Sequence, residues 1–107
     1  MICRQGGKYK SIHSNQIPNH NNTPIYPADL PDVYYDEDEQ EIIIDGTGDA
    51  SYYDVDIVSL STLDTVQSTC VNGTYDTIDV SSLPDDNYQI VIISSNENTY
   101  YGYFTNY

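Results

Sequence analysis

Apolar and polar residues alternate along the chain from about residue 33 onward, with the two-residue period that is typical of β-strands. In the segment 52–60, Tyr53, Val55 and Ile57 fall on one face, and the two aspartates between them fall on the other. Six further short segments are rich in strand-forming residues: 33–35, 41–45, 65–71, 77–80, 88–94 and 100–105. Turn-forming residues separate them and no segment has a helical period. The pattern predicts an antiparallel β-sandwich of about seven strands.

Two turns between these segments stand out in the sequence. The acidic run DEDEQE (36–41) separates the first two predicted strands. Asn72-Gly73 separates the fourth and fifth, and both residue types tolerate a positive φ. This dipeptide therefore predicts a two-residue β-hairpin.

The stretch SSLPDDNYQIVI (81–92) holds the most specific local signal. Leu83 and Pro84 end one strand, and Tyr88 begins the next with its side chain on the inward face. A tyrosine at this position predicts the tyrosine corner of Ig-like sandwiches, whose hydroxyl bonds to the backbone a few residues upstream. Residues 85–87 also carry oxygen ligands for a cation, but the corner already explains them as turn formers. The predicted fold is thus an Ig-like antiparallel β-sandwich with a tyrosine corner.

Three motifs occur together in this chain: Pro24-Ile25, the Ser-Leu-Pro-x-x-x-Tyr corner at 82–88 and the closing strand at 100–104. In these motifs the chain resembles a family of small gut-bacterial proteins that is catalogued as domain of unknown function 3244. The resemblance implies an Ig-like β-sandwich without an assigned activity. It also implies export behind a signal peptide, and hence a periplasmic, cell-surface or secreted protein of bacterial origin.

The stretch Ile-Asp-Val-Ser-Ser-Leu-Pro (78–84) before a tyrosine-led strand is also similar to C-terminal sorting domains of the type IX secretion pathway. Those domains typically end in a strand that bears lysine. This chain ends in YYGYFTNY, which has none.

The chain divides into two parts by composition. Residues 1–23 are rich in Asn, Gln, Ser, Gly and His, without periodicity, and we expect them to form a disordered tail. Residues 24–107 are expected to form the Ig-like domain, beginning with a proline-rich extended segment at 24–32. No apolar stretch approaches the roughly 20 residues of a membrane span, and no signal peptide is visible.

Charge narrows the choice of partners. The chain has 17 acidic and 3 basic residues, a net charge of −14, and all basic residues lie within the first ten positions. Such a field repels phosphates, so we expect no nucleic-acid partner. His13 and His20 match no zinc spacing and offer no fixed base for a serine. We expect no catalytic residues, no cofactor and no enzymatic activity.

Carboxylates form the first candidate site. Calcium prefers six to eight hard oxygen ligands, and Asp36, Glu37, Asp38 and Glu39 could converge with Asp45 in a neighbouring turn. The alternative is a solvated acidic hairpin, since dense like charges usually face water. The sequence leaves both open.

Exposed apolar residues form the second candidate site. If Gly102 and Phe104 point inward, the neighbouring outward positions form one face of the sheet that holds the third, sixth and seventh strands. That face would present Val58, Val91, Ile93, Tyr101 and Tyr103. An apolar face of this kind is typical of protein interaction surfaces, and stacked tyrosines can also receive a sugar ring. The sequence favours a structural or protein-interaction module, with a carbohydrate- or calcium-binding module as the alternative.

Overall fold

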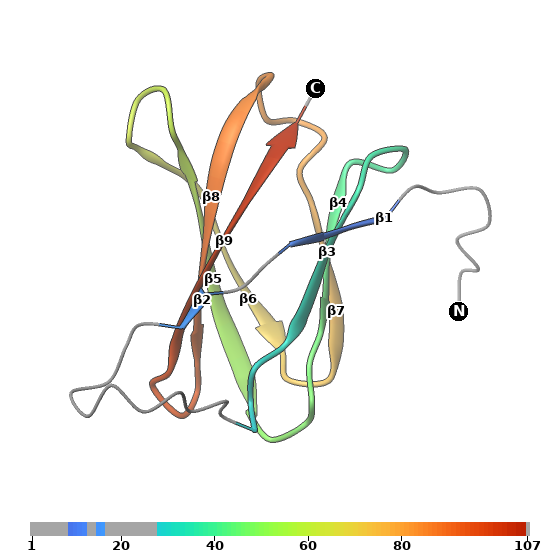
Figure 1. The fold of residues 1–107 in the computed structure, drawn as a ribbon, viewed down its shortest axis with the longest axis vertical. Helices are drawn as coiled ribbons and strands as arrows, with labels where there is room; N and C mark the ends of the chain where they lie inside the picture. Colours follow the sequence, from blue (N-terminus) through green and yellow to red (C-terminus); the bar gives the residue numbers. More distant parts are fainter. Residues whose placement is uncertain (1–8, 13–14, 17–27, 107) are drawn as a thin grey trace.

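The computed structural model describes residues 9–12, 15–16 and 28–106, and all regular secondary structure in them is β (Figure 1). The strands are β1 (Tyr9–Ile12), β2 (Asn15–Gln16), β3 (Asp32–Asp36), β4 (Glu41–Asp45), β5 (Tyr52–Ser59), β6 (Thr65–Asn72), β7 (Tyr75–Asp79), β8 (Asp86–Ser94) and β9 (Thr99–Asn106). Strands β3 to β9 match the seven predicted segments to within two residues at each end. No helix in these residues has the length and apolarity that crossing a membrane requires.

The strands form two antiparallel sheets that face each other (Figure 1). One sheet has the order β1-β3-β4-β7 and the other has the order β2-β9-β8-β5-β6. The third, sixth and seventh predicted strands are β5, β8 and β9, and they do lie in one sheet. The antiparallel β-sandwich that the sequence predicted is therefore confirmed.

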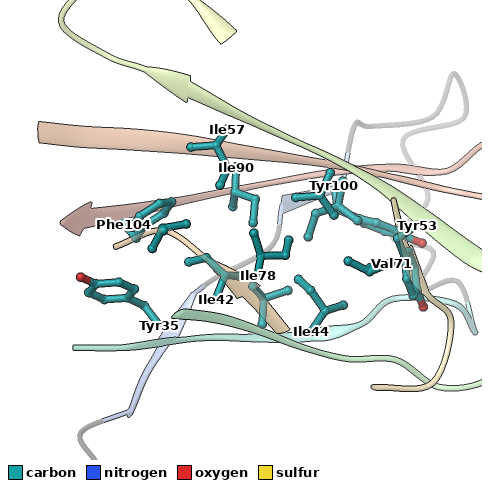
Figure 2. Close-up of a cluster of buried hydrophobic side chains, with 14 of the residues drawn as sticks. Tyr35, Ile42, Ile44, Tyr53, Ile57, Val71, Ile78, Ile90, Tyr100 and Phe104 are labelled. Atoms are coloured by element: carbon teal, nitrogen blue, oxygen red, sulfur yellow. The ribbon is translucent and has the colours of Figure 1, made fainter. Parts of the chain in front are cut away.

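The core lies between the two sheets, because alternate residues of each strand point inward. Figure 2 shows aliphatic side chains of both sheets meeting in the middle, with aromatic rings towards either end. The buried cluster includes Val33, Tyr35, Ile42, Ile44, Tyr53, Val55, Ile57, Ile78, Tyr88, Ile90, Ile92, Tyr100 and Phe104. Each fully buried side chain of this size stabilises the fold by about 1.5–3 kcal/mol. The predicted inward positions of 52–60 and 88–92 are confirmed.

Tyrosines supply every aromatic ring of this core except Phe104, and each of their hydroxyls has an acceptor. Tyr35 donates to Oδ1 of Asn106 at 2.5 Å, and Tyr53 donates to the backbone carbonyl of Asp29 at 2.8 Å. No buried side-chain nitrogen or oxygen among the described residues lacks a hydrogen-bond partner. The core thus gains aromatic area without leaving polar atoms unpaired, which would cost free energy.

The tyrosine corner is present. The hydroxyl of Tyr88 donates a hydrogen bond to the backbone carbonyl of Pro84, four residues upstream. The Tyr88 ring stacks on Phe104, with 5.4 Å between ring centroids. Burial, followed by the charges of Asp86 and Asp85, raises the pKa of the Tyr88 hydroxyl, which keeps it protonated as a donor.

Strands β1 and β2 lie within residues 1–23, for which the sequence predicted a tail without strands. For these six residues that prediction was wrong, and the rest of 1–23, together with 24–27, lies outside the described residues. β1 pairs with the edge strand β3, and β2 pairs with the edge strand β9. Pairing of this kind uses main-chain hydrogen bonds at a sheet edge, so it needs no alternating pattern in the sequence.

The turn at Asn72-Gly73 is not the predicted β-hairpin. β6 and β7 belong to different sheets, and neither Asn72 nor Gly73 has a positive φ. Instead Oδ1 of Asn72 accepts hydrogen bonds from the backbone N–H groups of Thr74 and Tyr75, at 3.1 and 2.9 Å. Glycine is required at 73 because a Cβ there would lie 1.8 Å from the carbonyl oxygen of Ala50.

Candidate functional site

The five apolar residues predicted to share a face do so, on the side of the five-stranded sheet that points away from the core. Strand register places Val58, Gln89 and Tyr103 in one row, and Asp56, Val91 and Tyr101 in the next. Ile93 follows in a third row beside Asp54 and Thr99. We call Val58, Val91, Ile93, Tyr101 and Tyr103 the outer-face patch.

The outer-face patch is only partly exposed, and it is not continuous. Tyr103 is 55% exposed and Ile93 is 38% exposed, whereas the other three side chains are half-buried. Polar and charged residues also lie on this face, since Asp54 and Asp56 run along β5 and Gln89 separates Val58 from Tyr103. The patch is therefore a mixed surface with an apolar side along β8 and β9 and an acidic side along β5.

Exposed apolar side chains nevertheless gather on this sheet. Seven large apolar side chains of the described residues are exposed: Tyr52, Leu60, Leu63, Val66, Tyr75, Ile93 and Tyr103. Six of them belong to β5, β6, β8, β9 or the β5–β6 loop, and only Tyr75 belongs to the four-stranded sheet. Leu63 stands out with 75% exposure and a φ of 64°, a conformation that a leucine rarely adopts.

An open hollow of about 330 Å³ borders the patch at the end of β9. It is lined by Leu60, Asn87, Tyr88, Tyr103, Phe104 and Thr105. Asn87 and Thr105 face each other on its polar side, where the Thr105 hydroxyl donates to Oδ1 of Asn87 at 2.6 Å. The hollow thus combines aromatic and aliphatic walls with one hydroxyl–amide pair.

The carboxylates predicted as a metal site are not brought together. Asp36 is buried, and its Oδ1 accepts the backbone N–H groups of Asp38 and Glu39 at 3.1 and 3.2 Å, which closes the β3–β4 turn. Asp45 ends β4, four residues from the start of that strand and so about 13 Å from the turn. Glu37 and Glu39 lie in the turn itself. No group of three or more Asp, Glu, His or Cys in the described part of the chain could hold a metal ion.

The second acidic stretch is likewise used within the fold. Asp86 accepts hydrogen bonds from the hydroxyls of Ser59 and Ser61, at 2.7 and 2.6 Å, and these bonds lower its pKa. They attach the start of β8 to the β5–β6 loop, which carries Leu60 and Leu63. His13, His20 and Cys3 lie outside the described residues.

Sequence reasoning missed the buried carboxylate of Asp29, which is 2% exposed. Its Oδ2 accepts the side-chain amides of Asn96 and Asn98, both at 3.1 Å, and its Oδ1 accepts Asn98 at 3.1 Å and the Tyr100 hydroxyl. The Tyr53 hydroxyl donates to its backbone carbonyl. These five residues form the Asp29 network, which joins the chain before β3 to β5 and to the β8–β9 turn.

Electrostatics explain why this carboxylate stays charged. Burial by itself raises the pKa of Asp29, but hydrogen bonds from Ser94, Tyr100, Asn98 and Asn96 outweigh burial and hold that pKa below its ordinary value. Burial, the hydrogen bond to Asp29 and the charge of Asp29 raise the pKa of Tyr100 well above its ordinary value. The pair therefore consists of an ionised carboxylate and a protonated phenol.

A second polar network closes the opposite end of the sandwich. The Asn106 side chain is fully buried, and its Nδ2 donates to the backbone carbonyls of Val80 and Leu83, both at 3.2 Å. Its Oδ1 accepts Tyr35 at 2.5 Å and Gln40 Nε2 at 3.3 Å. All four hydrogen-bonding positions of this amide are used. This Asn106 network joins β9 to β3, to the β3–β4 turn and to the tyrosine corner.

Comparison with known proteins identifies the type of sandwich. No family model and no curated protein matches the chain. Among solved structures, it is similar to the crystal structure of a DUF3244 family protein with an immunoglobulin-like β-sandwich fold from Bacteroides vulgatus. The TM-score is 0.72 at 16% sequence identity, over 94% of this chain and 100% of that one.

At 16% identity this similarity shows the fold, and the predicted Ig-like β-sandwich is confirmed. The neighbour also comes from the family that the motifs at 24–25, 82–88 and 100–104 resemble. The sequence motifs and the fold are thus both similar to those of proteins from this family of unknown role.

Proposed function

We propose that this Ig-like domain is a non-enzymatic interaction module that binds a protein partner through the outer-face patch. The observation that supports the proposal is the uneven distribution of exposed apolar side chains, six of seven of which belong to the five-stranded sheet and its loop. Exposed aromatic and aliphatic side chains that lie among polar groups are typical of interaction sites. Tyr103 and Leu60, on the two sides of the hollow, supply an aromatic and an aliphatic anchor.

A matched pair of tyrosines tests this proposal. Tyr103 is 55% exposed on the five-stranded sheet, and Tyr75 is 51% exposed on the four-stranded sheet. The wild-type domain, Tyr103→Ser and Tyr75→Ser are used as baits for chemical crosslinking in cells of the source organism. We expect a crosslinked partner that Tyr75→Ser retains and Tyr103→Ser loses by at least about tenfold. Equal recovery with all three baits contradicts a role for the patch.

Sugar binding is the second candidate, and the hollow beside Tyr103 favours it. An aromatic ring next to a hydroxyl–amide pair, Thr105 with Asn87, is a combination that receives a sugar ring. In a titration of ¹⁵N-labelled protein with simple glycans, this candidate predicts saturable shifts at residues 103–105. A protein-only module predicts no shifts at any glycan concentration.

We place this module in the periplasm, at the cell surface or outside the cell. The support is the sequence resemblance, since that family is usually exported. Fractionation of the source cells with an antibody against the domain tests the location, and recovery in the cytoplasmic fraction alone contradicts it.

A further inference from the structure

The two sides of the sandwich differ in how their sheet edges are covered. On one side the N-terminal strands lie along both edges, β1 on β3 and β2 on β9 (Figure 1). On the other side the sheets end in β7 and β6, and no described strand lies beyond either. An uncovered edge presents unpaired main-chain donors and acceptors to any extended chain.

The two uncovered edges are protected to very different degrees. β7 (YDTID) carries Asp76 and Asp79 within five residues, and charges on an edge strand discourage pairing. β6 (TVQSTCVN) carries no charge and no proline in eight residues, in a chain with 17 acidic residues. The register of β6 shifts once, near Val66, and runs without interruption from Gln67 to Asn72. That regular stretch is about 20 Å long.

The ladder shows which backbone groups of β6 point outward. The N–H of Gly73 donates to the carbonyl of Ser51 at 3.1 Å, so the pair 51–73 is hydrogen-bonded. In an antiparallel ladder bonded and non-bonded pairs alternate, which makes Asp54–Cys70 and Asp56–Ser68 non-bonded pairs. The N–H and C=O groups of Ser68 and Cys70 therefore point away from β5, towards the uncovered side.

The charged side chains near the edge of β6 indicate what kind of strand can pair with it. The side chains of Ser68 and Cys70 lie on the outer face next to Asp56 and Asp54, and Ser68 Oγ donates to Asp56 Oδ1 at 2.7 Å. A strand added beside β6 stands two strand spacings from these carboxylates, on the order of 10 Å. Long lysine or arginine side chains opposite Ser68 and Cys70 reach towards them. A second copy of this chain has the same net charge and is repelled.

We propose that the edge of β6 is a docking site for a basic, extended segment of another protein, which adds to the five-stranded sheet as a further strand. The main-chain groups of Ser68 and Cys70 provide the pairing, and Asp54 and Asp56 select for basic side chains. This inference goes beyond the role proposed for the outer-face patch, because it rests on a strand edge and not on apolar side chains.

The test titrates ¹⁵N-labelled protein with a nine-residue peptide that alternates lysine with valine, at low ionic strength. We expect saturable amide shifts concentrated at residues 67–72. The same peptide with glutamate in place of lysine should bind at least about tenfold more weakly, since its negative charges face Asp54 and Asp56. A lysine peptide N-methylated on the amides that face β6 should lose a similar factor, because it cannot donate to the strand.

Two proline variants locate the site. Ser68→Pro removes an N–H that points outward and leaves the main-chain bonds to β5 in place, at a position where edge strands tolerate proline. It also removes the hydroxyl that donates to Asp56. Thr77→Pro removes an outward N–H of β7, where the bonds Val80 N–H to Gln40 and Gly46 N–H to Thr74 place Thr77 outward. That N–H donates to Asp76 Oδ1 at 2.9 Å, and this bond is lost with it. We expect Ser68→Pro to weaken peptide binding at least about tenfold and Thr77→Pro to leave it unchanged.

Several results overturn the proposal. Equal binding of the lysine and glutamate peptides, an undiminished affinity of the N-methylated peptide, or shifts confined to residues 99–105 each contradict docking at β6. The wild-type domain could also dimerise without binding the peptide. If Ser68→Pro then abolishes the dimer, the edge of β6 pairs with a second copy of the chain instead. The N-methylated peptide decides the question even if Ser68→Pro does not fold. Since Tyr103→Ser tests the outer-face patch separately, either proposal can fail alone.

Discussion

Replacing Asp29 with asparagine tests the buried carboxylate with the smallest change of shape. The substitution keeps one acceptor oxygen and turns the other into an NH₂ group. If that group takes the place of Oδ2, it faces the amides of Asn96 and Asn98, so that donors oppose each other. Asn96 then loses its bond to the carboxylate, whereas Asn98 keeps its second bond, to Oδ1. The bonds from Tyr100 and Asn98 to Oδ1 persist, but they lose the charge of the acceptor.

The magnitude follows from these three bonds. Hydrogen bonds to charged groups stabilise by about 1.5–3 kcal/mol each and neutral ones by about 0.5–1.5 kcal/mol. Losing one charged bond costs about 2 kcal/mol, and neutralising two others costs about 1 kcal/mol each. Removing one negative charge from a chain of net charge −14 reduces its self-repulsion and stabilises the fold by roughly 1 kcal/mol. We expect Asp29→Asn to lower the free energy of unfolding by about 3 kcal/mol, or the melting temperature by about 12–20 °C.

Thermal and urea unfolding at about pH 7 measure this effect, with Asp32→Asn as the control for the same change at an exposed position. The pH dependence adds a second readout. The pKa of Asp29 is lower in the folded protein than in the unfolded chain, so its stabilisation is complete above the unfolded value of about 3.9. It is lost as the pH falls through the folded value. The difference between wild type and Asp29→Asn should therefore shrink below about pH 4.

Two outcomes refute this reasoning about the Asp29 network. One is a melting temperature of Asp29→Asn within about 2 °C of that of Asp32→Asn, which means that the buried bonds contribute no net stability. The other is a difference between wild type and variant that stays constant down to about pH 3, which means that the folded pKa of Asp29 is not lowered.

Three further predictions concern the tyrosine corner, the acidic turn and the N-terminal strands. Tyr88→Phe leaves the Pro84 carbonyl without its donor. It should lower the free energy of unfolding, measured in urea, by about 1–2 kcal/mol, and an unchanged urea midpoint contradicts a stabilising role of the corner. Excess calcium should raise the melting temperature no more than sodium chloride of equal ionic strength, and a specific rise of about 10 °C would reveal a metal site. Deleting residues 1–16 should lower the melting temperature because β3 and β9 lose their edge partners, and an unchanged value contradicts that pairing.

The sequence predicted those parts of the fold in which local pattern and burial agree. In β5 and β8 every second residue is buried, and all of these except the last in each strand, Ser59 and Ser94, are apolar, so the period defines strand and face. The tyrosine corner was predictable because its donor and acceptor, Tyr88 and Pro84, lie only four residues apart. The outer-face patch was predicted from the same alternation. That prediction did not take into account that Asp54 and Asp56 lie on the same face.

Features that depend on distant partners were not predictable. Asp29 lies in a proline-rich stretch, and nothing nearby indicates that Asn96, Asn98 and Tyr100 surround it. β1 and β2 form through main-chain bonds to sheet edges, which leave no pattern in their side chains. Asn72-Gly73 looked like a hairpin because the dipeptide permits one, whereas sheet topology decides that the chain crosses to the other sheet there.

The two polar networks have a consequence for how long the domain stays folded. Tyr100 with Asp29, and Tyr35 with Asn106, each join positions 71 residues apart, so both contacts close long loops. We expect contacts of such separation to form late in folding, because closing a long loop costs entropy before the contact is made. Contacts that are absent from the transition state slow unfolding without accelerating folding. Stopped-flow measurements on Asp29→Asn should show faster unfolding at an unchanged folding rate, and slower folding contradicts this order of events. Long intervals between unfolding events protect a domain from any protease that cleaves opened chains faster than they reclose.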